Sequence, residues 1–243
     1  MSDALAAAAV VIPTFNEAPN IARLAEALRA LSPGLLIIVV DDGSPDGTGK
    51  AADEAAARLQ PMQVIHRTGK GGRGSACIAG FKAMLADPKV KYLLEMDADF
   101  SHDPKEMPEM LEILERGEAD VVVRSRYAPE SRIIDWSIAR RVFSRLANIF
   151  ARSLLGIPIT DYTNGYRAYT RKAAEAIDFD KVAASGYIVL SEIAYQLHLK
   201  GIKFVCLPTI FVNRRRGQSN LSLKEIMGAF TGITSLRSRY GRS

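Results

Sequence analysis

The first 125 residues alternate short apolar runs with segments of helical periodicity, and this alternation constrains the fold more than any other feature of the chain. Five runs rich in aliphatic and β-branched residues predict strands over 7–12, 35–40, 62–66, 91–96 and 120–124. The segments between them predict helices over 18–31, 47–59, 72–86 and 104–116. Apolar strands that alternate with helices are typical of an α/β fold, in which helices cover both faces of a mostly parallel sheet.

The second half of the chain, from residue 126 on, loses this alternation. Its patterns predict a long helix over 135–155, a short strand within 161–169, a helix over 188–200, strands within 202–213 and a last helix over 222–238. The sequence contains no internal repeat and no Pro/Ser-rich linker. We therefore expect one domain over residues 1–243, with ligands bound beyond the carboxyl ends of the strands.

Composition excludes several classes of protein and sets an expectation about the compartment. With 48% hydrophobic and 24% charged residues, the chain is neither a disordered segment nor a small disulfide scaffold. Its two cysteines, Cys77 and Cys206, lie in apolar surroundings, which favours a reduced, cytoplasmic setting. The N-terminal residues lack the pattern of a signal peptide, and no apolar run approaches the roughly 20 residues that cross a bilayer.

Charge divides unevenly along the chain. Residues 1–120 hold 12 Lys and Arg against 19 Asp and Glu, whereas residues 121–243 hold 20 against 8. A basic C-terminal half predicts an anionic partner there, although a chance sorting of surface charges would give the same pattern. The triplet 214–216 (RRR) has no aromatic residues among its arginines and is a weak signal for nucleic acid, so we expect no nucleic-acid partner.

Acidic residues directly follow three of the predicted strands. They occur in the segments 13–17 (PTFNE), 41–48 (DDGSPDGT) and 97–99 (DAD). Carboxylates at neighbouring strand ends repel one another unless a cation lies between them, and oxygen ligands favour Mg²⁺ or Mn²⁺ over zinc. Taken singly, 41–44 could form an Asx-type turn and 97–99 a solvated loop. Together the segments predict a divalent-metal site.

A glycine-rich basic segment, 69–74 (GKGGRG), has the G-x-G-x-x-G spacing between a predicted strand and a predicted helix. A dinucleotide-binding loop is therefore an alternative interpretation. Against it, the segment follows the third strand instead of the first, contains Lys70 and Arg73, and is followed by a pair of acidic residues instead of a single one. Backbone N–H groups and a lysine in such a loop also suit contact with any diphosphate.

These motifs resemble those of the family-2 glycosyltransferases of the GT-A fold, and the resemblance covers about residues 8–225. Later segments are similar to the dolichol-phosphate (polyprenol-phosphate) mannosyltransferases: 125–127 (SRY), Arg140 with Ser144, 163–169 (TNGYRAY) and 211–214 (FVNR). The resemblance implies a GT-A fold with a nucleotide-sugar half over about 1–125 and an acceptor- and membrane-facing half over about 126–243. It also implies metal-dependent, inverting transfer of a hexose to a polyprenyl phosphate. The expected donor is GDP-mannose, with UDP-glucose or another UDP-sugar as the alternative.

The resemblance further implies roles for individual residues. The donor and its diphosphate are expected to contact Pro13, Phe15, Glu17, Val40, Asp42, Lys70, Asp97, Ala98, Arg214 and Asn220. A Mg²⁺ or Mn²⁺ ion is expected at Asp97, Asp99 and Ser101. The transfer itself is expected to depend on Asp99, Arg126, Arg140, Ser144 and Arg214, of which Arg140 and Ser144 would address the acceptor phosphate.

Four positions depart from the family's pattern and leave the donor sugar and base open. Phe15 stands where a Tyr is usual, Asn220 where a Lys is frequent, and Leu190 where a polar residue is expected before Glu192. Arg124 replaces a common Gly and introduces a charge that we expect near the site.

The predicted helix over 135–155 carries apolar residues around much of its surface together with arginines 140, 141, 145 and 152. Such a helix can lie in a bilayer interface, although a core helix with arginines extending to solvent shows the same pattern. A lipid-phosphate acceptor favours the first interpretation, so we expect a peripheral protein at the cytoplasmic face of a membrane. The last helix could add a second contact or dock onto a membrane-anchored partner subunit. A catalytically silent, membrane-recruited subunit is a further alternative, against which the intact pair Asp97 and Asp99 argues.

Overall fold

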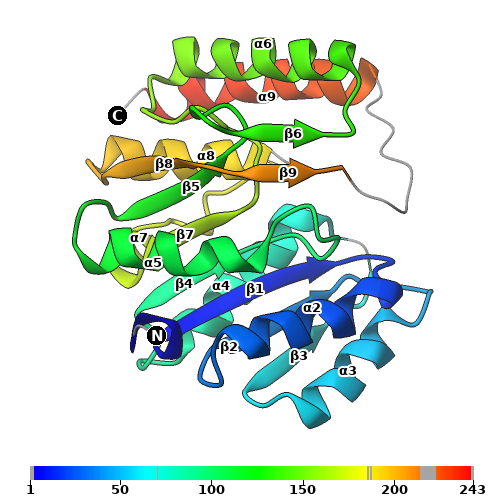
Figure 1. Cartoon of the computed structure of the whole chain (residues 1–243). Helices are drawn as coiled ribbons and strands as arrows, with labels where there is room; N and C mark the ends of the chain where they lie inside the picture. The colour runs from blue at the N-terminus through cyan, green and yellow to red at the C-terminus, as the bar shows by residue number, and fades with distance from the viewer. Residues whose placement is uncertain (1–2, 70, 185, 187, 214–222, 242–243) are drawn as a thin grey trace.

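The computed structural model describes residues 3–69, 71–184, 186, 188–213 and 223–241. Its strands are β1 (Ala8–Thr14), β2 (Leu36–Asp41), β3 (Met62–His66), β4 (Tyr92–Glu95), β5 (Val121–Ser125), β6 (Arg132–Ile134), β7 (Arg167–Thr170), β8 (Phe204–Pro208) and β9 (Ile210–Val212). Its helices are α1 (Asp3–Ala6), α2 (Ala18–Leu31), α3 (Thr48–Arg58), α4 (Arg73–Ala86), α5 (Met107–Glu115), α6 (Ile138–Leu155), α7 (Arg171–Glu175), α8 (Ile188–Leu199) and α9 (Leu223–Tyr240). A 3-10 turn over Pro104–Glu106 leads into α5. Figure 1 shows the helices on both sides of a central sheet.

The main sheet has the order β3-β2-β1-β4-β7-β5-β8. Every described pairing in it is parallel except those of β7, which runs antiparallel to both β4 and β5. The prediction of an α/β fold with a mostly parallel sheet is therefore confirmed. Because β7 lies between β4 and β5, strands from the two halves of the chain form one sheet. A second, two-stranded sheet pairs β6 with β9 in parallel.

Alternate residues of the central strands face two separate apolar layers. In β1, Val10 belongs to the layer that includes α2, α3 and α5, and Val11 belongs to the layer that includes α4 and α8. Both side chains have 0% exposure. A strand that is buried on both faces needs apolar residues at every position, and this requirement explains the continuous aliphatic runs of the N-terminal half.

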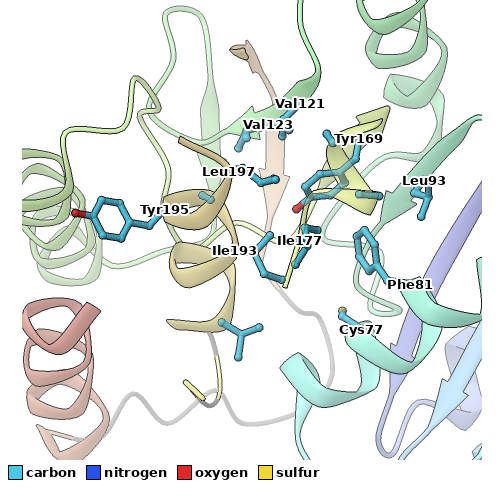
Figure 2. Packing of buried hydrophobic residues seen from close by; sticks show 14 of the residues in the cluster. Cys77, Phe81, Leu93, Val121, Val123, Tyr169, Ile177, Ile193, Tyr195 and Leu197 are labelled. Carbon is cyan, nitrogen blue, oxygen red and sulfur yellow. The ribbon is translucent and has the colours of Figure 1, made fainter. Parts of the chain in front are cut away.

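The second of these layers packs α4 closely against the sheet. Gly80 of α4 lies so near Val11 that an added Cβ would fall 2.1 Å from the Val11 Cγ2 atom. The rings of Phe81 and Tyr169 meet edge to face with their centroids 5.2 Å apart, and Figure 2 shows both in the cluster with Leu197 of α8. This packing fixes α4, and with it the glycine-rich loop that precedes the helix.

The C-terminal half differs from the prediction in its details. The helix expected over 135–155 begins only at Ile138, because the Ser137 hydroxyl accepts a hydrogen bond from the Arg140 N–H and caps the helix. Asp135, with a φ of 62°, separates this helix from β6, which the sequence analysis did not predict. The short helices α1 and α7 were not predicted either.

The helices α6 and α9 lie side by side at one end of the molecule, above β6 in the view of Figure 1. Arg237 of α9 donates a hydrogen bond to the Leu154 carbonyl oxygen of α6 at 3.3 Å. Across the part of the chain that the structure describes, no helix combines the length and apolar character needed to cross a bilayer.

Candidate active site

The carboxyl ends of β2, β1 and β4 meet at one edge of the main sheet. Thr14 of β1 is in register with Asp41 of β2, and Val11 of β1 is in register with Glu95 of β4. Because the three strands are parallel neighbours, the acidic segments that follow them leave the sheet at the same edge. The sheet order thus brings together the segments that the sequence singles out.

Asp42 connects the second strand to the glycine-rich loop. Its buried carboxylate accepts hydrogen bonds from Arg67 Nη1 at 2.6 Å and from the Gly72 N–H at 2.7 Å. One of the N–H groups of the loop is therefore satisfied by a protein carboxylate. This arrangement differs from a dinucleotide fingerprint, in which the N–H groups of the loop face the pyrophosphate.

The neighbouring acidic residues, Asp41 and Glu17, hold their own loops in place. The Asp41 carboxylate accepts from the Ser44 N–H at 3.1 Å and from the Ser44 hydroxyl at 2.5 Å, which forms the Asx-type turn that was the alternative interpretation of this segment. Glu17 accepts from Asn20 Nδ2 at 2.9 Å, and its backbone N–H donates to the Thr48 hydroxyl at 2.8 Å. The Asp41 carboxylate therefore holds the loop after β2 in its turn, and the Glu17 backbone N–H ties the loop after β1 to the start of α3.

The other residues expected at the nucleotide differ in accessibility. Pro13 and Phe15 are partly exposed at the end of β1. Val40 has 0% exposure and Ala98 has 3%, and both side chains belong to the apolar layers of the core. Any contact that Val40 makes with a ligand is therefore restricted to its backbone, and the donor-binding roles of these residues stay predictions.

The segment 97–101 presents the expected metal-binding groups. Asp99 Oδ1 accepts from the Ser101 N–H at 3.0 Å, and the buried Ser101 hydroxyl has no hydrogen-bond partner among the described residues. A buried oxygen without a partner, next to two carboxylates, fits the ligands of a hard divalent cation. The described residues contain no group of three His, Cys, Asp or Glu side chains that could hold a metal ion. Diphosphate oxygens and water would have to complete the coordination, as is usual for Mg²⁺.

Arg73, which the sequence analysis did not assign to the site, is the main partner of this segment. Its Nε atom donates to Asp97 Oδ1 at 2.7 Å, Nη1 to Glu95 Oε2 at 3.2 Å and Nη2 to the Gly165 carbonyl oxygen at 3.2 Å. Burial alone would lower the pKa of Arg73, but the negative charges of Asp97 and Glu95 raise it well above its ordinary value. Arg73 thus remains charged and joins α4 to the ends of β4 and the loop before β7.

Arg126, which is expected to contribute to the transfer, is held by a buried carboxylate. Its Nε and Nη2 atoms donate to the two oxygens of Asp161 at 2.7 and 2.8 Å, and Nη2 also donates to the Thr163 hydroxyl at 2.7 Å. Asp161 has 0% exposure. Burial would raise the pKa of Asp161, but the charge and hydrogen bonds of Arg126 hold it below its ordinary value. The sequence analysis missed Asp161, which lies just before the motif 163–169.

Arg140 lies over the ring of Trp136, with its guanidinium carbon 4.0 Å from the ring centroid. Its Nη1 atom contacts Asn213 Oδ1 at 3.3 Å. Arg126 approaches the same ring at 5.2 Å, so the two expected acceptor-site arginines share one aromatic partner. Ser144 lies one turn further along α6, near Tyr127. Burial raises the pKa of Tyr127, and the nearby Arg126 and Ser144 offset part of this rise.

Aromatic contacts connect the segment after β4, where a metal is expected, to Trp136 and the arginines that lie over it. The Phe211 ring lies 5.7 Å from the ring of His102 and 5.6 Å from that of Trp136, between centroids. His102 is fully buried, contacts Asn164 Oδ1 at 2.8 Å and stacks on Tyr166. Beside it, residues 100–104 together with Glu106, Ile210 and Val212 line a hollow of about 280 Å³.

Arg124 does not contribute a charge to the site, contrary to the expectation from its sequence position. Its guanidinium donates to the Pro208 carbonyl oxygen at 2.7 Å, to the Glu106 carbonyl oxygen at 2.6 Å and to Glu109 Oε2 at 2.5 Å. Only 2% of Arg124 is exposed. The residue therefore joins β5 to α5 and to the end of β8, and its presence carries no information about the donor.

Three residues expected at the site, Lys70, Arg214 and Asn220, lie outside the described residues. Leu190 is another of the four departures from the family's pattern, and it is buried in α8. Its carbonyl oxygen accepts a hydrogen bond from Arg167 Nη1 at 2.8 Å.

Comparison with known proteins agrees with these observations. The family model described as "Glycosyl transferase family 2" matches residues 9–178. The chain is 39% identical over 237 residues to the polyprenol monophosphomannose synthase of Mycolicibacterium smegmatis, covering 96% of this chain and 89% of that protein. It is also 39% identical over 224 residues to the undecaprenyl-phosphate mannosyltransferase of Micrococcus luteus, covering 92% of this chain and 91% of that protein.

Solved structures support the fold. Glucosyl-3-phosphoglycerate synthase from Mycobacterium tuberculosis, in complex with Mn²⁺, UDP-glucose and phosphoglyceric acid, aligns with a TM-score of 0.67 and 23% identity, covering 98% of this chain and 83% of that one. At this identity the likeness concerns the architecture, which is that of the GT-A glycosyltransferases. The sequence matches carry the assignment of family and enzyme class. The chain is a glycosyltransferase and belongs to glycosyl transferase family 2.

Proposed function

We propose that this protein is a metal-dependent, inverting glycosyltransferase that transfers mannose from GDP-mannose to a polyprenyl phosphate. The two relatives at 39% identity are named for mannose transfer to polyprenyl phosphates, and each matches nearly the whole chain. The observation on this chain that carries the proposal is the arrangement of its two charged groups. The carboxylates Asp97 and Asp99 follow β4, and the arginines Arg126 and Arg140 lie over Trp136, which Phe211 connects to the metal side.

The acceptor chemistry suits these residues. The second pKa of a phosphate monoester is about 6, so its oxygen is already deprotonated at neutral pH and needs no strong general base. The protein must instead hold an anionic acceptor close to an anionic donor. Arg140 and Arg126 would offset the acceptor's charge and orient it, with Ser144 on the same helix as Arg140.

The donor side requires stabilisation of a leaving diphosphate. A divalent cation at Asp97, Asp99 and Ser101 would supply charge neutralisation there. Asp97 is unsuited to act as a base, because one of its oxygens accepts a hydrogen bond from Arg73. The Mn²⁺ in the M. tuberculosis enzyme of similar fold supports a divalent ion, either Mg²⁺ or Mn²⁺, in this role.

An exposed apolar row on α6 supports the further proposal that the protein docks at the cytoplasmic face of a membrane. Ile138, Val142, Leu146 and Ile149 are 80%, 53%, 58% and 56% exposed. Their spacing of four, four and three residues places them on one face of the helix. The exposed arginines 141, 145 and 152 flank this row, as in helices that lie in a bilayer interface. Such docking would bring a lipid phosphate to Arg140. In this proposal the neighbouring α9 adds to the same surface or docks onto a membrane-anchored partner subunit.

The test is a transfer assay with labelled donors. Vesicles that contain undecaprenyl phosphate are incubated with GDP-mannose, UDP-glucose or UDP-galactose and with Mg²⁺ or Mn²⁺. We expect labelled lipid from GDP-mannose with metal, and loss of at least about 100-fold of the rate in Asp99→Asn, in line with the effect of removing a group that stabilises the leaving charge. Transfer from a UDP-sugar alone would replace the proposed donor. If no donor gives labelled lipid, the proposed reaction is wrong.

A further inference from the structure

Trp136 lies where the two expected acceptor-site arginines meet. It follows β6 and precedes the first turn of α6, and it is 8% exposed. Figure 1 shows this junction, in which β6 lies beside β9 and leads into α6. The guanidinium carbons of Arg140 and Arg126 lie 4.0 and 5.2 Å from its ring centroid. Arginines at these distances are attracted to the electron-rich face of an indole.

The two arginines are fixed differently at their other contacts. Two nitrogens of Arg126 bind the carboxylate of the buried Asp161, so its position is set by a strong charged pair. The contact of Arg140 with Asn213 is to a neutral amide oxygen and is longer, at 3.3 Å. The Arg140 guanidinium carbon lies closer to the Trp136 ring than that of Arg126 does, at 4.0 against 5.2 Å, so the attraction to the ring is stronger for Arg140.

The indole N–H of Trp136 is buried and has no hydrogen-bond partner among the described residues. A buried donor usually forms a hydrogen bond. The contacts of Trp136 that the structure records are those of its ring, to Arg140, Arg126 and Phe211. Replacing Trp136 by Phe would thus preserve an aromatic face and remove no hydrogen bond that the structure records.

We propose that Trp136 is a positioning residue for a phosphate monoester: its ring holds the Arg140 guanidinium next to Arg126, so that both charges address one phosphate group. This inference rests on the proposed function, because it specifies how the acceptor site of that reaction is assembled. The ring attracts both guanidiniums without adding a negative charge of its own. A carboxylate in the same place would hold the arginines equally well but would also repel the acceptor.

The kinetic test compares Trp136→Phe with Trp136→Leu. We expect Trp136→Leu to raise the KM for the lipid phosphate roughly tenfold, because the aromatic face is lost, while the KM for the nucleotide-sugar changes less than about twofold. In Trp136→Phe, the KM for the lipid phosphate should stay close to that of the wild type. Loss of packing alone would lower the melting temperature and affect donor and acceptor alike. Two results would overturn the proposal. One is an unchanged KM for the lipid phosphate in Trp136→Leu, and the other is an equal rise in the KM values for donor and acceptor.

A binding test uses the fact that Trp136 is the only tryptophan of the chain, so the intrinsic fluorescence of the wild-type protein reports on this residue. Citronellyl phosphate, inorganic phosphate, citronellol and GDP are titrated separately. We expect both phosphates, but not citronellol, to change the emission, and Arg140→Gln to weaken the response to citronellyl phosphate roughly tenfold. A stronger response to citronellyl phosphate than to inorganic phosphate would assign the site to the lipid headgroup.

Two results of the titration would contradict the inference: no response to either phosphate, or a response to GDP that exceeds the response to citronellyl phosphate. The titration does not need sugar transfer. If the transfer assay fails while citronellyl phosphate still changes the emission through Arg140, the proposed function is wrong and the phosphate site at Trp136 stands. The titration also keeps the inference testable if Trp136→Leu does not fold.

Discussion

At the scale of single residues, the arginines at and near the site differ in their partners. Arg73 and Arg126 bind carboxylates that lie beneath the site, and Arg124 joins structural elements away from it. Arg140 instead contacts an aromatic ring and a neutral amide. The sequence does not distinguish these uses, because the partners come from distant segments: Glu95 is 22 residues from Arg73, and Asp161 is 35 residues from Arg126.

We expect Arg73→Met to lower the free energy of unfolding by about 3 kcal/mol, because the change leaves Glu95, only 1% exposed, without its cation. The double variant Arg73→Met/Glu95→Gln should be more stable than the sum of the single changes predicts, with a coupling of at least about 1 kcal/mol. Urea unfolding measures both quantities. The control is Arg58→Met, which breaks an exposed pair with Glu26 and should cost less than about 0.5 kcal/mol. Additive effects at Arg73 and Glu95 would show that the pair contributes no specific stabilisation.

The lowered pKa of Asp161 should make the stability of the protein depend on pH. Its folded-state pKa lies below its ordinary value of 3.8, so the stabilisation by its charge is present above that value and is lost as the pH falls below it. We expect Asp161→Asn to lose about 3 kcal/mol at pH 7, because Arg126 keeps its buried charge without a partner. The difference from the wild type should shrink below about pH 4. Urea unfolding at several pH values measures it, and a difference that stays constant down to pH 2.5 would exclude Asp161 as the titrating group.

At the scale of elements, the sequence predicted the regular parts well and the junctions poorly. The strand over 62–66 and the helix over 18–31 have the predicted bounds, because their apolar periodicity reflects burial directly. β6 was missed because it has three residues, of which Arg132 and Ile134 are exposed and Ile133 is partly buried, so no periodicity is visible. The acceptor phosphate is expected at this junction. The family resemblance assigned a role to Arg140, whereas Trp136 was interpreted as an apolar residue of the helix.

The helix α6 carries a prediction about membrane binding. Leu146→Glu removes one side chain of the exposed apolar row and should weaken binding to undecaprenyl-phosphate vesicles roughly tenfold or more, since burying a leucine contributes about 1.5–3 kcal/mol. Because Leu146 is 58% exposed, the free energy of unfolding should change little. The matched control is Leu199→Glu, which changes a leucine of similar exposure, 51%, at the end of α8. Vesicle sedimentation measures binding, and equal losses in both variants would show that α6 is not the docking face.

At the scale of the whole molecule, the uneven charge has a structural basis. The acidic half includes the carboxylates at the ends of β1, β2 and β4, several of which are buried and engaged by arginines or backbone N–H groups. The basic half includes exposed arginines on α6, next to the apolar row. A basic half could also have served a nucleic acid; the apolar row beside the arginines makes an anionic membrane the better match.

This arrangement predicts that binding to an anionic membrane depends more on where the positive charges lie than on the net charge of the chain. Arg145→Gln/Arg152→Gln removes two exposed charges from α6, and Lys89→Gln/Lys91→Gln removes two from exposed positions in the acidic half. Each basic residue near an anionic membrane contributes about 1 kcal/mol, so the α6 variant should bind vesicles with about 30% phosphatidylglycerol at least roughly tenfold more weakly, and the lysine variant about as well as the wild type. In neutral phosphatidylcholine vesicles the two variants should bind alike, and salt should remove the difference in anionic ones, because ions screen the attraction over about 10 Å at 0.1 M. Equal losses in the two variants on anionic vesicles would mean that the net charge of the chain, and not its distribution, governs the attraction.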